Sequence, residues 1–264
     1  MARFHVLNPV DGSTALPAVK AISFSDLRDV LARGWDDFCA WPTHAIYLCL
    51  IYPIVGLALG GLALGYTVLP MVFPLAAGFA LLGPFAALVM YELSRRREMG
   101  EPASFGAAVG VLNSPSFPAI AALGLLLMGL FLAWLYVARD IYQSQFGVLA
   151  PDSAVSFLHD VFTTPAGWRL MLYGNLAGLL FAVIAFCVSV ISFPMLLDRD
   201  VGAATALMTS VRAVAANPVV MAGWGLIVAA LLVLGSIPAF IGLAVVMPVL
   251  GHATWHLYRK VVER

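Results

Sequence analysis

The feature that most constrains the fold is a run of 39 residues, 219–257, that contains no Asp, Glu, Lys or Arg. About 20 helical residues cross a hydrocarbon layer of roughly 30 Å, so this run is too long for a single crossing. The turn-forming segment Gly235–Pro238 (GSIP) divides the run. We therefore predict two membrane spans, 219–234 and 238–257, joined by a tight hairpin.

Four more apolar stretches predict four further spans, at about 43–66, 68–93, 118–137 and 170–197. Only 11% of the 264 residues are charged, whereas soluble domains carry roughly 25%. The predicted fold class is all-α: a polytopic transmembrane helix bundle of six spans with short amphipathic helices on the cytoplasmic side. We expect a flexible N-terminal segment, 1–23, followed by one membrane domain, 24–264.

The positively charged residues predict the orientation of these spans. With six spans, 12 of the 14 Lys and Arg residues fall on the side that holds both termini, and only Arg139 and Arg169 fall on the other. Because cytoplasmic loops are enriched in Lys and Arg, both termini are predicted to be cytoplasmic.

A weak internal repeat accompanies the predicted spans. Its unit is an interfacial helix, a proline and a helical hairpin, and it occurs three times. Apolar positions mark the three interfacial helices: Leu27, Val30 and Leu31; Phe105, Val109 and Leu112; Leu207, Val211 and Val214. Matches of this quality also arise by chance in apolar sequence, so both readings stay open.

Three stretches and one short motif resemble a known family. They are Gly78–Glu101 (GFALLGPFAALVMYELSRRREMGE), Ser192–Trp224 (SFPMLLDRDVGAATALMTSVRAVAANPVVMAGW), Met247–Val262 (MPVLGHATWHLYRKVV) and Gly34–Phe38 (GWDDF). The sequence from about Phe24 to its end resembles the DUF2189 family of predicted bacterial integral membrane proteins. The resemblance implies a six-helix protein of the bacterial inner membrane, and it implies no particular activity.

Histidines are the first candidates for chemistry. His252 and His256 are four residues apart and share one face of the last predicted span. They could bind a metal or haem together, and His44, at the start of the first span, could complete a cluster of three. The alternative is that Trp255 and Tyr258 mark an aromatic belt, in which these histidines make interfacial hydrogen bonds.

Carboxylates are the second candidates. Glu92 precedes Arg95 and Arg96 at helical spacing, which favours structural ion pairs, although an acid at the end of a span is also a candidate proton or cation ligand. Asp36 and Asp37 could form a paired-carboxylate site. Without a nucleophile or a metal ligand spaced with them, we interpret them as an acidic surface.

Small residues predict close helix packing. The GxxxG pairs are Gly56 with Gly60, Gly61 with Gly65, and Gly174 with Gly178. They could serve contacts within the chain, with a second copy of it or with another membrane subunit. Asn175 is one of the few polar residues inside a span and marks the place where a transport cavity would lie.

No catalytic motif is readable, so no enzyme activity and no cofactor are predicted. The net charge of zero excludes a strongly basic nucleic-acid binder. The first hypothesis is an accessory, assembly or scaffolding protein that binds the lipid bilayer and other membrane subunits or itself. The alternatives are a small-solute transporter or channel, and a haem or metal protein through His44, His252 and His256.

Overall fold

The computed structural model describes residues 16–40, 54, 69–102, 110–149, 151–238 and 240–263. It is 83% helical, and no strand occurs among these residues. The only bridge in these ranges is an isolated antiparallel pair between Val19 and Val262. The prediction of an all-α fold is confirmed.

Four helical stretches in the described part are long and apolar enough to cross a membrane. They are Leu69–Glu98, Phe117–Phe146, Pro165–Asp198 and Pro218–Ser236. The first predicted span, 43–66, lies outside the described residues except for Ile54, and the last predicted span is not among these four. The chain therefore has several apolar membrane helices, and six spans remain a prediction.

Two of the four stretches are interrupted near prolines, because a proline ring clashes with the carbonyl four residues earlier. The helix before Pro84 changes to a 3-10 turn at Ala80, and the helix before Pro194 ends at Ser189. The resulting elements are α4 (Leu69–Phe79), η1 (Ala80–Leu82), α5 (Gly83–Ala86), α6 (Leu88–Glu98), α10 (Pro165–Ser189) and α11 (Ser192–Asp198).

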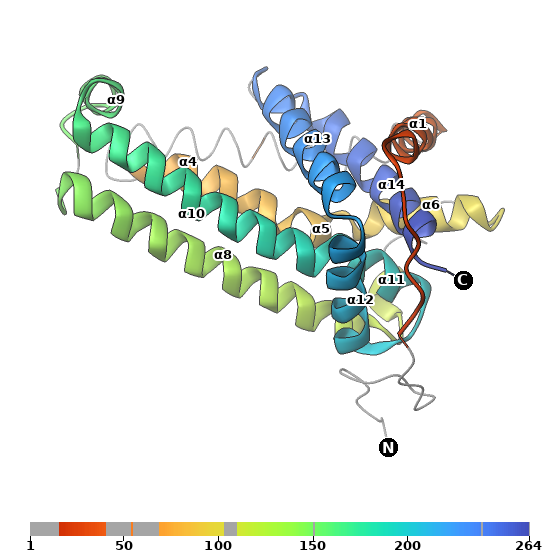
Figure 1. The fold of residues 1–264 in the computed structure, drawn as a ribbon. Helices are drawn as coiled ribbons and strands as arrows, with labels where there is room; N and C mark the ends of the chain where they lie inside the picture. The colour runs from red at the N-terminus through yellow and green to blue at the C-terminus, as the bar shows by residue number, and fades with distance from the viewer. Residues whose placement is uncertain are drawn as a thin grey trace. The chain divides into compact units, whose positions relative to one another are not determined.

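The helices form two compact units, and the first comprises Met1–Pro53, Gly83–Leu125 and Phe186–Arg264. In this unit α1 (Phe24–Ala40) packs along α14 (Leu243–Val261), and α14 also contacts α6, α11 and α13 (Pro218–Ser236) (Figure 1). The same unit contains η2 (Gly110–Asn113) and α12 (Gly202–Ala216).

The apolar stripe of α1 differs from the expectation of an interfacial helix. Leu27 and Val30 are at most 1% exposed, because α14 covers that face. The stripe therefore packs on protein instead of on lipid. The helix breaks near the predicted turn, because α13 ends at Ser236 and α14, which packs against α13, begins at Leu243.

The second unit comprises Ile54–Leu82 and Leu126–Ala185. It holds α4, most of α8 (Phe117–Phe146), α9 (Ala154–Thr163) and most of α10. Its centre is Trp134 of α8, which is 3% exposed, donates a 2.8 Å hydrogen bond to the carbonyl of Pro74 and packs against Phe181. Gly78 and Gly178 lie against the same indole ring.

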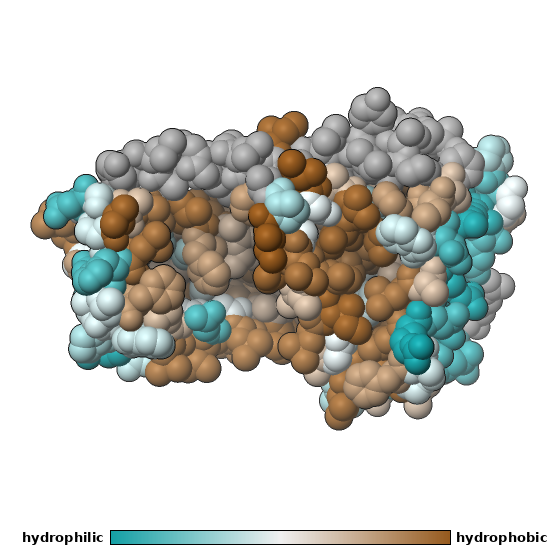
Figure 2. Space-filling view, turned by 90° about the horizontal axis from the view of Figure 1, so that it is seen from above, coloured by the Kyte–Doolittle hydropathy of each residue, from teal (hydrophilic) through white to brown (hydrophobic). Residues whose placement is uncertain are grey.

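Large apolar side chains remain exposed on the membrane helices. Figure 2 shows that apolar side chains cover most of the face that it presents. On α10, for example, Leu172, Leu176 and Leu179 are 56%, 57% and 62% exposed. Such a surface is stable in a bilayer because lipid tails, not water, contact it.

Candidate functional site

Five polar side chains from α1, α6 and α14 meet inside the first unit, and we call them the Asp37 cluster: Asp37, Ser94, Arg97, His252 and His256. The carboxylate of Asp37 accepts hydrogen bonds from the Ser94 hydroxyl and from Arg97, each at 2.5 Å. Nε2 of His256 lies 2.9 Å from the same carboxylate. Nδ1 of His252 lies 2.8 Å from the Ser94 hydroxyl.

Glycines set the helix spacing that these hydrogen bonds require. A Cβ atom at Gly34 of α1 would lie 2.7 Å from the Cβ of Ala253 and 2.8 Å from the carbonyl oxygen of Val249, both on α14. A Cβ atom at Gly251 would lie 2.7 Å from the Cβ of Met90 on α6. Only glycine allows the three helices to approach so closely.

The charge of the cluster follows from its hydrogen bonds. Burial raises the pKa of the Asp37 carboxyl, but the hydrogen bonds from His256 and Ser94 outweigh it and leave the pKa below its ordinary value. Asp37 is therefore ionised at neutral pH. His252 is fully buried. Its Nε2 atom makes no hydrogen bond of standard geometry with the described residues. The main chain of Met90 lies beside the imidazole ring.

The geometry of the cluster fits helix docking better than nucleophilic catalysis. A catalytic serine needs its hydroxyl proton directed at a histidine and its oxygen accessible to substrate. Ser94 donates to Asp37 instead and is 1% exposed. The cluster joins three helices through a shared, satisfied carboxylate.

A second polar cluster extends along α14 toward α11, formed by Glu98, Asp198, Trp255, Tyr258 and Arg259. Arg259 bridges the carboxylates of Glu98 at 2.8 Å and Asp198 at 3.1 Å, and the Tyr258 hydroxyl donates to Asp198 at 2.6 Å. Beside it lies a cavity of about 440 Å3, lined by Arg95, Glu98, Met99, Asp198, Arg199, Trp255 and Arg259.

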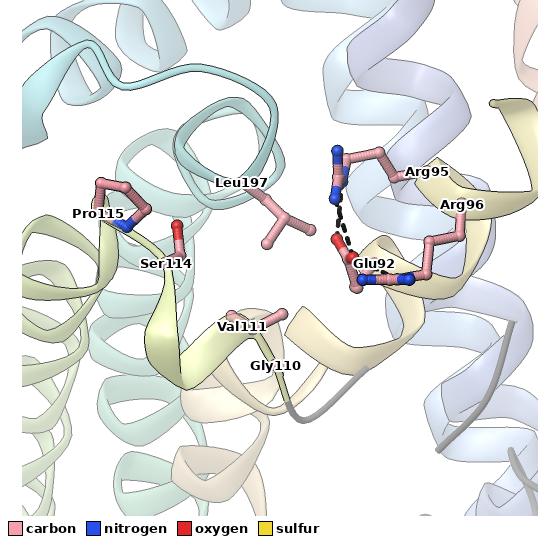
Figure 3. Close-up of a pocket in the computed structure, with 8 residues that line it drawn as sticks. All are labelled: Glu92, Arg95, Arg96, Gly110, Val111, Ser114, Pro115 and Leu197. Carbon is pink, nitrogen blue, oxygen red and sulfur yellow. Dashed lines mark hydrogen bonds and ion pairs between the residues drawn. The ribbon is translucent and has the colours of Figure 1, made fainter. Parts of the chain in front are cut away.

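Glu92 forms the ion pairs that its spacing predicts. Its carboxylate, 3% exposed, accepts two hydrogen bonds from Arg95 at 2.7 and 2.9 Å and one from Arg96 at 2.6 Å. Figure 3 shows these three side chains on one side of a cavity of about 250 Å3. Gly110, Val111, Ser114, Pro115 and Leu197 complete its lining. Because two guanidinium groups already hold the carboxylate, its negative charge is compensated within α6.

The structure brings His252 and His256 together around Asp37, a carboxylate more than 200 residues away. His44 lies outside the described residues, so the hypothesis of a three-histidine metal or haem site stays untested. Within the ranges described, no group of three His, Cys, Asp or Glu side chains is placed to hold a metal ion.

The interpretation of Asp36 and Asp37 as an acidic surface is correct for Asp36 and wrong for Asp37. Asp36 is exposed, whereas Asp37 is 5% exposed, because it lies on the same helical face as Leu27, Val30 and Gly34. That periodicity was readable in the sequence and would have placed Asp37 among the buried residues. Sequence reasoning also missed Ser94, Arg97, Glu98 and Asp198.

The glycine pairs have different surroundings. Gly56, Gly60, Gly61 and Gly65 lie outside the described residues. On α10, a Cβ atom at Gly178 would lie 3.2 Å from the ring of Trp134, whereas one at Gly174 would meet no described atom within 4 Å. Asn175 is exposed, and its amide nitrogen donates to the carbonyl of Met171 at 2.7 Å.

In a comparison with known families, residues 72–198 fit the model of DUF2189, described as predicted integral membrane protein. Residues 72–198 are therefore similar to the DUF2189 family. This matched region covers just under half of the chain and confirms the resemblance for that part of the sequence. It includes Ser94, Arg97 and the Glu92 ion pairs, while Asp37 and both histidines of the Asp37 cluster lie outside it.

The family match and the apolar helices together establish an integral membrane protein. Neither the search of curated proteins nor the search of solved structures found a match. The function of the chain must therefore be argued from its own residues.

Proposed function

We propose that this chain is a non-enzymatic accessory, assembly or scaffolding protein that binds another helix within the bacterial inner membrane. It spans that membrane six times with both termini in the cytoplasm. The observation that carries the proposal is the outward-facing amide of Asn175 on α10, beside the open surface at Gly174.

The amide lies deep within a span. Asn175 is ten residues after Pro165, the first residue of α10, or about 15 Å along a helix that rises 1.5 Å per residue. Its neighbours Leu172, Leu176 and Leu179 are exposed and apolar. At that depth there is no water to solvate a polar group.

Asn175 uses only part of its hydrogen-bonding capacity. A side-chain amide offers two donors and one acceptor, and one donor is used within α10. No other hydrogen bond of this amide occurs among the described residues. An interhelical hydrogen bond from a partner would satisfy it, and such bonds contribute about 0.6–2 kcal/mol in membranes.

Gly174 provides the space for that partner. Membrane helices associate at small residues because their backbones can then approach closely. A glycine with no described atom nearby, next to an amide that uses one donor among the described residues, fits an approaching helix better than it fits lipid tails. The paired charges elsewhere support the same role, because the carboxylates of Asp37 and Glu92 are already paired with residues of the chain itself.

The test is a photo-crosslinking experiment in native membranes. A photoreactive residue at Leu176 of α10 should crosslink to one partner in stoichiometric amount, whereas the same residue at Leu226 of α13, also exposed at 71%, should not. The double variant Gly174→Ile, Asn175→Leu should reduce the crosslinked product at least tenfold. Gly129→Ile should leave it unchanged, because a Cβ atom at Gly129 would also meet no described atom within 4 Å.

Each outcome has a clear meaning. A crosslink to a differently tagged copy of the chain identifies self-association, and one to another protein identifies the subunit served. Recovery of the uncrosslinked chain alone, or a product that persists in the double variant, contradicts the proposal. If water-soluble reagents modify a cysteine placed at Asn175, the amide lines an aqueous path, and the transporter hypothesis replaces this one.

A further inference from the structure

The short helix α9 presents an apolar stripe that nothing in the described part of the chain covers. Val155, Leu158 and Phe162 are 79%, 52% and 59% exposed. Their spacing of three and four residues places them on one helical face. Leu149, just before the helix, and Trp168, just after it, are exposed at 80% and 60%.

A second face of α9, beside the apolar stripe, is polar. This face holds Ser156, His159, Asp160 and Thr163. A third set attaches α9 to the unit that contains it, since Phe157 packs edge-on against Tyr142 and Phe146 near the end of α8. The helix therefore has one face on protein, one suited to water and one apolar face without a described contact.

The direction of α9 is fixed by the residues at its ends. Ser153 caps its first turn by accepting a hydrogen bond from the main chain of Ser156. At the other end Thr164 donates to the carbonyl of Asp160 and accepts from the main chain of Gly167. A Cβ atom at Gly167 would clash with the last carbonyls of α9, so glycine is needed for this sharp turn.

This turn sets α9 across the axis of the membrane span that follows. In Figure 1 α9 is seen nearly end-on, while α10 runs along the page. The helix α9 thus lies where α8 ends and α10 begins. A helix that lies across the spans at their ends has the geometry of an interfacial helix.

We propose that α9 binds the bilayer itself, lying in the interface with Val155, Leu158 and Phe162 among the acyl chains. This helix connects the ends of two helices that could cross a membrane, and its apolar stripe has no described cover, which argues for lipid as the occupant. Trp168 would lie at the same depth in the bilayer as α9, because tryptophan is enriched at membrane interfaces.

The charges of this region define the kind of lipid surface. Between positions 139 and 169 there are two basic and three acidic residues: Arg139, Arg169, Asp140, Asp152 and Asp160. A surface with this balance gains nothing from anionic lipid, unlike a Lys-rich amphipathic helix. The occupant is therefore a zwitterionic lipid surface bound through apolar area.

The test uses the full chain in nanodiscs of zwitterionic lipid, with native cysteines replaced and an environment-sensitive dye on a single new cysteine. Leu158→Cys and Phe162→Cys probe the apolar stripe, and His159→Cys on the polar face is the matched control. Brominated acyl chains should quench the dye at 158 and 162 at least twice as strongly as at 159. Aqueous iodide should show the reverse order.

Further measurements distinguish lipid, water and protein as the surroundings of the apolar stripe of α9. Adding 30% anionic lipid should change the quenching at 158 by less than a fifth. Equal iodide quenching at 158 and 159 would place α9 in water and overturn the proposal. Shielding at 158 from both quenchers, or shielding that disappears when the chain is diluted in lipid, would identify a protein occupant and also overturn it.

Discussion

Replacing Asp37 with asparagine should release α1 from the rest of its unit. The substitution keeps the shape of the side chain and removes the charge that Ser94, Arg97 and His256 share. Removing one member of a buried ionic network costs about 3–5 kcal/mol when the partner stays buried. How much of this free-energy cost applies to Asp37→Asn depends on how deeply each hydrogen-bond partner of Asp37 is buried.

Arg97 contributes little to the loss, because its side chain is 42% exposed and water can solvate it. His256 and Ser94 contribute more, since their exposed fractions are 15% for the His256 side chain and 1% for Ser94. A hydrogen bond to a charged group contributes about 1.5–3 kcal/mol. Asparagine still offers a neutral acceptor, so the expected loss in unfolding free energy is about 2–3 kcal/mol.

The assay is equilibrium unfolding in detergent, followed by tryptophan fluorescence, together with limited proteolysis of α1. Asp36→Asn is the matched control, because Asp36 is exposed next to the same site and surface changes usually stay within about 0.5 kcal/mol. If Asp37→Asn were no more destabilising than Asp36→Asn, the Asp37 cluster would not hold α1 in place.

Two more substitutions test how α1 is held. Gly34→Ala should destabilise the chain by about 1–3 kcal/mol in the same unfolding assay, because the added methyl group meets the backbone of α14, while Gly129→Ala should not. Hydrogen bonds from Lys260 and Ser23 lower the pKa of Asp26 to about 2. Their stabilisation is therefore complete above about pH 4 and is lost as the pH falls toward 2. Asp26→Asn should flatten that loss in a pH series of thermal midpoints, and an unchanged acid slope would contradict this assignment.

Much of the secondary structure could be predicted from hydropathy. The stretches near 68–93, 118–137, 170–197 and 219–234 correspond to the helical stretches that could span a membrane, because about 20 apolar residues specify such a helix by themselves. The hairpin turn was readable from its Gly, Ser and Pro residues. The helix breaks before Pro84 and Pro194 follow from the steric clash of the proline ring, so they could also be predicted from the sequence.

Tertiary contacts were the part that the sequence analysis could not supply. Glu92 and its arginines are neighbours on one helix, so their pairing follows from spacing alone. Asp37 and His256 are 219 residues apart, and their contact depends on how α1 lies on α14. Nothing local encodes that docking except Gly34, whose missing side chain matters only once the partner helix is known.

The same distinction explains why α1 and α9, both amphipathic, have different partners. The apolar stripe of α1 includes Gly34 and the buried Asp37, a shape and a charge that only a specific protein surface can match. The stripe of α9 has neither a glycine for close approach nor a buried charge, and its valine, leucine and phenylalanine side chains need only an apolar medium. Composition of the stripe, not amphipathicity as such, therefore separates a helix that docks on protein from one suited to lipid.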